Sequence, residues 1–333
     1  MNHGIDIHTH IVPEQFPAYA GTGRDVPWPS MAHDHCGHAS VVISGKNYRT
    51  VPSTCWDCTA RTRGMDEQRI ARQVLSPMPE LLSYWLPLDA GQQICRHLNE
   101  TIASMVSRDP TRFTGLGAVP LQDVDAGIAE LEFVMRSLKL SGVEIATHIN
   151  GVSIGDPKFD PFFTVVESLG AAVFVHGLRP AGKDRLVGPA ALEQVVAFPG
   201  DVALAAASLI TGGMLERHPH LRIALSHGGG AMAMVLPRLE HGWKTAQPIK
   251  DSIPRAPSEY AKRLYADSLV YDPHALRAVI RTFGEDKVMI GTDFPFVIAD
   301  PNPHGSIDAI APSSELALAL REGNARRFLG LTN

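Results

Sequence analysis

Four histidines and one aspartate occupy positions that suit metal chemistry, because each lies at the end of a short apolar run or directly after one. They are His8, His10, His176, His227 and Asp293. Three imidazoles and a carboxylate suit a divalent ion such as zinc, with one coordination position left for water. A lone strand-end histidine is more often a hydrogen-bonded core residue, but the joint arrangement predicts a metal centre that activates water.

Parallel strands alternating with helices would bring these residues together. Apolar stripes in 89–107 and 123–138 predict amphipathic helices between strands. Strands are predicted at Ile5–His8, Gln73–Ser76, Phe113–Ala118, Gly142–Ala146, Ala171–His176, Leu221–Ser226, Leu264–Ser268 and Val288–Gly291. Eight such strands with interleaved helices predict the α/β class and a (β/α)8 TIM barrel, in which strand ends converge at one mouth.

One connection is far longer than the two to six residues usual after a barrel strand. More than sixty residues separate the first two predicted strands. Within them, 40–43 and 48–51 alternate around a turn at 44–47, which predicts a β-hairpin. A loop after a strand lies on the active face of a barrel. We therefore expect the inserted segment, residues 11–62, to cover the site within a single domain of residues 1–333.

Composition limits the class of protein. The chain has 333 residues, is 44% hydrophobic and 20% charged, and carries a net charge of −5. This balance argues against nucleic acid or a membrane surface as a partner. Long uncharged runs such as Val202–Leu215 are short of the ~20 residues that a membrane helix needs. No secretory signal opens the sequence, and four cysteines are too few for a disulfide scaffold, so we expect a cytoplasmic globular protein.

These motifs resemble the amidohydrolase superfamily, and in particular its branch of 2-amino-3-carboxymuconate 6-semialdehyde decarboxylases. The superfamily motifs are Asp6–His10, Val175–His176, Ser226–Gly230 and Gly291–Phe296. The branch is favoured by Gly45–Arg49, Val119–Asp123, Pro257–Tyr260 and Gly323–Ala325. The resemblance covers nearly the whole chain.

The resemblance implies a set of site residues. One zinc ion per chain would be held by His8, His10, His176 and Asp293, with Asp293 also catalytic. His227 would stay off the metal and act as the base toward its bound water. Arg49 would bind the carboxylate of a small-molecule substrate, and Arg238 would do so across a homodimer interface. Phe296, in the last motif, is a further candidate substrate contact.

The sequence departs from its relatives in ways that leave alternatives open. Residues 178–185 follow the fifth strand, lack the tryptophan of the related decarboxylase and carry extra cations, so Arg179 or Arg185 could hold another anionic group. The fourth strand lacks the lysine of two-metal superfamily members, although Glu144 or His148 could bridge a second ion.

Other chemistry-bearing residues have weaker spacing. The cluster 33–38 with Cys55 and Cys58 could form a structural zinc site. His304, in the loop after the last strand, is expected on the active face and could touch substrate or be a plain loop residue.

The preferred interpretation is a zinc-dependent, non-oxidative decarboxylase of a small unsaturated or aromatic carboxylate. Arg49 and Arg238 favour it, because a guanidinium binds two carboxylate oxygens at once. The same metal site could instead hydrolyse a lactone or amide, or hydrate a double bond. A barrel that binds a metal or metabolite without catalysis is the third hypothesis, and a His227→Asn variant would separate it from the first two.

Overall fold

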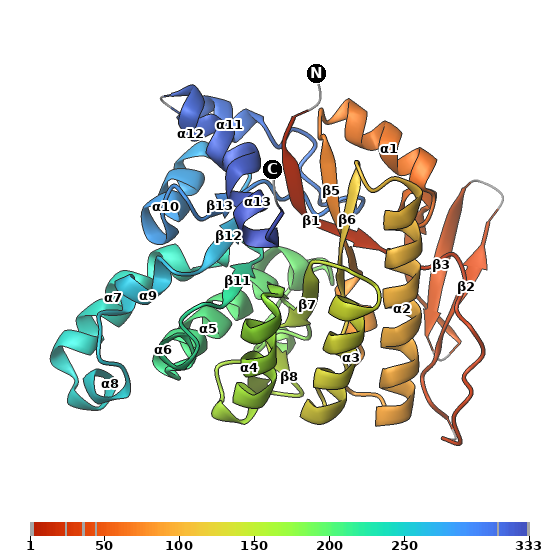
Figure 1. Cartoon of the computed structure of the whole chain (residues 1–333), viewed down its shortest axis with the longest axis horizontal. Coiled ribbons are helices and arrows are strands. Elements are labelled where there is room, and N and C mark those ends of the chain that lie inside the picture. The colour runs from red at the N-terminus through yellow and green to blue at the C-terminus, as the bar shows by residue number, and fades with distance from the viewer. Residues whose placement is uncertain (1–2, 24, 35–36, 44, 312, 332–333) are drawn as a thin grey trace.

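A closed ring of eight parallel strands forms the centre of the molecule (Figure 1). The computed structural model describes residues 3–23, 25–34, 37–43, 45–311 and 313–331. The ring consists of β1 (Ile5–Ile11), β5 (Arg72–Pro77), β6 (Phe113–Gly117), β7 (Gly142–Ala146), β10 (Ala172–His176), β11 (Arg222–Leu225), β12 (Tyr265–Asp267) and β13 (Val288–Met289), in that order. Parallel bridges from Asp6 to Ile290 and from Thr9 to Phe294 close it. The predicted barrel and all eight predicted strands are confirmed.

Helices surround the ring and bury one apolar stripe each. The longest, α2 (Leu88–Arg108), buries Ile94, Leu98 and Ile102, which recur at the four-residue spacing of one helix face. The other helices that cover the barrel are α1 (Cys58–Glu67), α3 (Val124–Arg136), α4 (Asp160–Leu169), α5 (Phe198–Thr211), α7 (Met232–Thr245), α10 (Pro273–Phe283) and α13 (Asn324–Leu329). Shorter helices are α6 (Met214–Arg217), α8 (Gln247–Ser252), α9 (Pro257–Ala261), α11 (Gly305–Ile310) and α12 (Ser314–Leu318).

The segment after β1 forms a small antiparallel sheet of its own, set at one edge of the molecule (Figure 1). Its strands are β2 (Pro29–His33), β3 (His38–Ile43) and β4 (Lys46–Pro52), in the order β2-β3-β4. The predicted hairpin is therefore present as β3 and β4, with β2 added beside it. Ser44, part of the predicted turn, lies outside the described residues. A second short hairpin, β8 (His148–Ile149) and β9 (Val152–Ser153), follows β7.

The barrel interior is filled by a separate apolar cluster. Side chains from the strands, including Ile7, Leu116, Phe174 and Met289, pack there together with Phe328 of α13. These residues are 0% exposed, so the inside of the barrel is packed solid. The polar site must therefore lie at the end of the barrel beyond this apolar cluster, where His10 lies near the end of β1 and His176 ends β10.

One helical stretch, Glu193–Thr211, is apolar and long enough to cross a membrane by length and composition alone. Half of it is buried inside the fold, and its α5 part packs against β10 and α7. Helices in the core of a barrel share this composition, because one face meets the sheet and the other meets neighbouring helices.

Candidate metal centre

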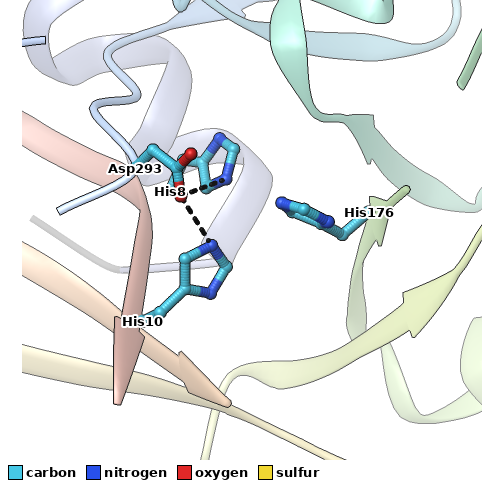
Figure 2. A group of neighbouring side chains, drawn as sticks. All are labelled: His8, His10, His176 and Asp293. Atoms are coloured by element: carbon cyan, nitrogen blue, oxygen red, sulfur yellow. Dashed lines mark ion pairs between the residues drawn. The ribbon is translucent and has the colours of Figure 1, made fainter. Parts of the chain in front are cut away.

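Three histidines and an aspartate converge on one point at the carboxyl end of the barrel (Figure 2). They are His8 and His10 from β1, His176 at the end of β10, and Asp293 after β13. One donor atom from each lies within 4.8 Å of the others, and all four residues are buried. Figure 2 shows His176 facing the other three from the opposite side. These are the four predicted ligands, and they form the one such group within the part of the chain that the structure describes.

Each of the three imidazoles is held through its Nδ1 atom, and Asp293 Oδ1 lies 3.1 Å from His10 Nε2 and 3.7 Å from His8 Nε2 (Figure 2). His8 Nδ1 lies 2.7 Å from Asp267 Oδ2, while His10 Nδ1 and His176 Nδ1 lie 3.0 and 2.8 Å from the backbone carbonyl oxygens of Pro77 and Gly177. None of the three buried Nε2 atoms has a hydrogen-bond partner. A buried polar atom without a partner is costly, unless it binds an ion. The donor set therefore fits a divalent cation.

Carboxylates set the charge of this site. Burial lowers the pKa of His8, but the hydrogen bond and charge of Asp267 outweigh it and raise that pKa to about 9. Burial raises the pKa of Asp6 to about 7, although Thr292 Oγ1 donates a hydrogen bond to it at 2.6 Å. Asp6 also accepts from the backbone N–H of His8 at 3.2 Å. Through its bond with Thr292, Asp6 links β1 to the segment that follows β13.

His227 lies beside the metal ligands but outside their group. Its ring centre is 4.9 Å from that of His176 and 5.3 Å from that of His8. Burial, followed by the charge of His8, lowers the pKa of His227 to about 4, which keeps the ring neutral near pH 7. Its backbone is left-handed, with a φ of 55°. Gly230 follows in the same turn, where a Cβ would stand 2.0 Å from the carbonyl oxygen of Pro199, so only glycine fits at this position.

Arg49 and Phe296 line the same cavity and contact each other. Arg49, on β4 of the inserted sheet, donates from Nη2 to Glu80 Oε1 at 3.1 Å. Its guanidinium carbon lies 4.7 Å from the ring centre of Phe296, which in turn stacks on His10 with ring centres 5.3 Å apart. Only one of the guanidinium donors is engaged by Glu80, so the others remain for a ligand. The inserted segment thus supplies part of the site wall.

Arg238 is not part of this cavity within one chain. It is an exposed residue of α7 and lines a separate surface hollow with Val235 and Leu239. Its expected role requires a second subunit.

The other candidates lie apart from the metal group. Glu144 is buried near His10, with its Oε2 3.8 Å from His10 Nδ1, but it accepts from Ser76 Oγ and stands outside the four ligands. His148 Nε2 lies 3.1 Å from the carbonyl oxygen of Arg179. His33 Nε2 lies 2.8 Å from the carbonyl oxygen of Glu14, and the described residues around Cys55 and Cys58 bring no metal-binding group of three together. His35 and Cys36 of that cluster lie outside the described residues.

The expected place of His304 on the active face is wrong, and with it the possible contact with substrate. Its ring lies 4.5 Å from that of His3 and packs against Gly4, just before β1 begins. This is the opposite end of the barrel from His8 and His10. After β13 the chain runs without a strand to α11, and this length lets it cross from one end of the barrel to the other.

Two functional neighbours were not found from the sequence. Asp267 ends β12 and accepts from the backbone N–H groups of His227 and Gly228 at 2.9 and 2.6 Å, in addition to holding His8. Its place at the end of a predicted strand was the available signal. Arg61 of α1 is fully buried and donates to the carbonyl of His10 and to Gln73 Oε1. Nothing in the sequence around it distinguishes it from a surface arginine.

The profile of the family described as Amidohydrolase matches residues 5–331. The chain belongs to the amidohydrolase family. A 2-amino-3-carboxymuconate-6-semialdehyde decarboxylase from Dictyostelium discoideum is 37% identical over 330 residues, covering 98% of this amidohydrolase and 91% of that protein. The predicted superfamily and branch are confirmed, and with them the predicted enzyme class, a metal-dependent carboxy-lyase.

Solved structures share the fold. The apo form of Metarhizium anisopliae IDCase superposes with a TM-score of 0.84 at 22% identity, covering 99% of this amidohydrolase and 97% of that chain. A dihydroxybenzoic acid decarboxylase from Polaromonas, with bound manganese and an inhibitor, gives a TM-score of 0.79 at 22% identity, covering 100% and 98%.

Proposed function

We propose that this amidohydrolase is a non-oxidative decarboxylase of a small unsaturated or aromatic carboxylate. One observation supports this most strongly. Three of the four proposed ligands, His10, His176 and Asp293, line one cavity together with His227 and the guanidinium of Arg49. The named decarboxylases among its relatives act on substrates of this class.

The proposed metal is a single zinc ion held by the predicted ligands His8, His10, His176 and Asp293. When bound, such an ion supplies a Lewis acid and lowers the pKa of a bound water. The imidazole-rich donor set favours zinc, although a Polaromonas relative of the same fold was solved with manganese. Metal analysis must therefore include both.

The residues of the chain divide the remaining work. Arg49 orients the substrate by binding its carboxylate through two N–H groups. Decarboxylation replaces the carboxylate by a proton on the same carbon. His227 is the neutral base beside the ligands, so we assign to it the proton taken from water and delivered to that carbon, while the remaining hydroxide leaves with the carbon dioxide as bicarbonate. Phe296 supports both ends of this arrangement, because its ring contacts His10 on one side and Arg49 on the other.

A cytoplasmic homodimer completes the proposal. Arg238 is exposed on α7, and Met234 and Val235 beside it are 80% and 40% exposed. Apolar side chains around an exposed arginine are typical of protein interfaces. In a dimer built on this surface, Arg238 would approach the site of the partner subunit and bind substrate there.

The test is a product assay on the purified, metal-loaded enzyme. Small unsaturated and aromatic carboxylates are incubated without oxygen, and carbon dioxide and product mass are measured. The proposal predicts loss of 44 mass units, as carbon dioxide, from at least one of them. A gain of one water on the true substrate would instead identify a hydrolase or hydratase.

A further inference from the structure

A second, larger cavity opens beside the metal centre. The space directly over the ligands measures about 10 Å³, room for about one water molecule, whereas the neighbouring cavity measures about 710 Å³. The two share Glu80 and Phe198 in their walls. Pockets for small organic ligands usually measure roughly 300–1,000 Å³. A substrate that reaches the metal must therefore place its remaining atoms in the larger space, which we call the outer cavity.

The outer cavity has an excess of positive charge. Its charged lining residues are Lys46, Glu80, Arg179, Lys183 and Glu193. Both carboxylates are already paired, Glu80 with Arg49 at 3.1 Å and Glu193 with Lys183 at 3.9 Å. Among the ion pairs between described residues, none involves Lys46 or Arg179. An anionic ligand would therefore find uncompensated cations on this wall.

Arg179 is held in a position that suits binding. Its guanidinium carbon lies 3.3 Å from the ring centre of Trp85, a stacking contact that orients the planar group. Its backbone is left-handed, with a φ of 48°, a conformation that is uncommon outside glycine. The described residues offer its side chain no hydrogen bond, so its N–H edge is available. Stacking and backbone conformation together fix the guanidinium group of Arg179 before a ligand arrives, which lowers the entropy lost on binding.

We propose that Arg179, stacked on Trp85, binds a second carboxylate of the substrate in the outer cavity. The enzyme would then select dicarboxylates over monocarboxylates. This inference rests on the proposed function in one respect, because it takes the first carboxylate to bind beside Arg49.

Binding of simple probes tests the proposal without turnover. Calorimetry on the metal-loaded enzyme compares benzoate with benzene-1,3-dicarboxylate and benzene-1,4-dicarboxylate. The wild type should bind at least one dicarboxylate about tenfold more tightly than benzoate, the gain expected for one charge-assisted carboxylate contact. Arg179→Gln should remove this preference and leave benzoate affinity within about twofold, while Arg179→Lys should retain part of it. Arg185→Gln is the matched control in the same segment and should behave as wild type.

Two results would overturn the proposal that Arg179 binds a second carboxylate. One is a wild type that binds neither dicarboxylate more tightly than benzoate. The other is an Arg179→Gln variant that loses benzoate affinity equally, which would indicate a structural role. Decarboxylation without a dicarboxylate preference would reject the subsite alone. A preference that disappears in Arg179→Gln, in an enzyme that releases no carbon dioxide from any carboxylate, would reject the proposed function and leave the subsite standing.

Discussion

The metal centre and the outer cavity meet at Glu80 and Phe198 but are built differently. In the metal centre, His8 and His10 are 0% exposed, and the Nδ1 atom of each imidazole is fixed by a hydrogen bond to a residue at a strand end. In the outer cavity the cations lie at the surface, on the inserted sheet and on the segment after β10. Lys183 is held by one ion pair, with Glu193, and Arg179 by stacking on Trp85.

This difference separates reaction from selection. The ends of barrel strands are rigid and can hold ligands to the tolerance that a metal requires. Segments added to the barrel can change without disturbing those ends, so they can alter which substrate is accepted. Substitutions in the metal centre should therefore lower activity toward every substrate, whereas substitutions in the outer cavity should change which substrate is preferred.

The largest effect is expected from His227→Asn. Turnover should fall about a thousandfold, the scale of a lost general base, while the metal is retained. Asparagine tolerates the left-handed backbone at this position better than most residues, so the fold should persist. Steady-state kinetics and metal analysis on the same preparation measure both. Unchanged turnover would remove His227 from the mechanism.

Asp267→Asn should weaken metal binding by about 10- to 100-fold, the usual cost of losing the partner of a ligating histidine. The amide cannot reproduce the charged contact with His8 Nδ1 at 2.7 Å. Competition with a coloured chelator measures the affinity. Asp286→Asn, at an exposed aspartate, is the control. Equal affinity in the Asp267 and Asp286 variants would show that Asp267 does not support the metal centre.

Arg49→Gln should raise KM roughly tenfold for monocarboxylates and dicarboxylates alike, because both use the inner carboxylate contact. Metal content should stay at the wild-type level, since Arg49 contacts Glu80 and Phe296 and none of the ligands directly. Arg63→Gln, on the exposed face of α1, is the control for loss of a positive charge. A KM that rises only for dicarboxylates would place Arg49 in the outer cavity instead.

The smallest effect is expected at His304, at the other end of the barrel. Burial, together with the charges of His3, Arg321 and Arg69, lowers its pKa to about 4. The unfolded chain would take up a proton near pH 6.5, but the folded chain only near pH 4. Stability should therefore fall as the pH drops between these values, by at most about 1.4 kcal/mol per pH unit from this group.

Denaturant unfolding of the wild type and of His304→Gln isolates this contribution. The variant should lose less stability than the wild type over the same pH interval, with metal content and substrate preference unchanged. An identical pH dependence in both proteins would show that His304 is protonated equally in the folded and unfolded states.

The sequence predicts those parts of the molecule that follow from local patterns. Buried parallel strands are nearly continuous apolar runs, and a polar residue that ends such a run must lie at one rim of the barrel. His8, His176 and Asp293 could therefore be placed together without any knowledge of distances. The hairpin at β3 and β4 could also be predicted from a local pattern, the alternation of side-chain types on both sides of a turn.

Contacts between segments far apart in the chain could not be predicted in this way. Asp267 supports His8 from 259 residues away, and the partners of Arg61 come from β1 and β5. His304 was misplaced because a loop without a strand has no period that fixes its direction. Arg179 shows the same limit, since its stacking on Trp85 depends on how two loops meet.

Metal analysis of the purified protein shows whether His8, His10, His176 and Asp293 hold an ion. The wild type is compared with His8→Ala, with Asp293→Ala and with His241→Ala, an exposed control on α7. If these residues form a metal centre, the wild type and the control should contain about one divalent ion per chain, and the other two variants should lose it. Two results would show that these residues are not a metal centre. One is an absence of metal in protein never exposed to chelator, and the other is metal retained in both ligand variants.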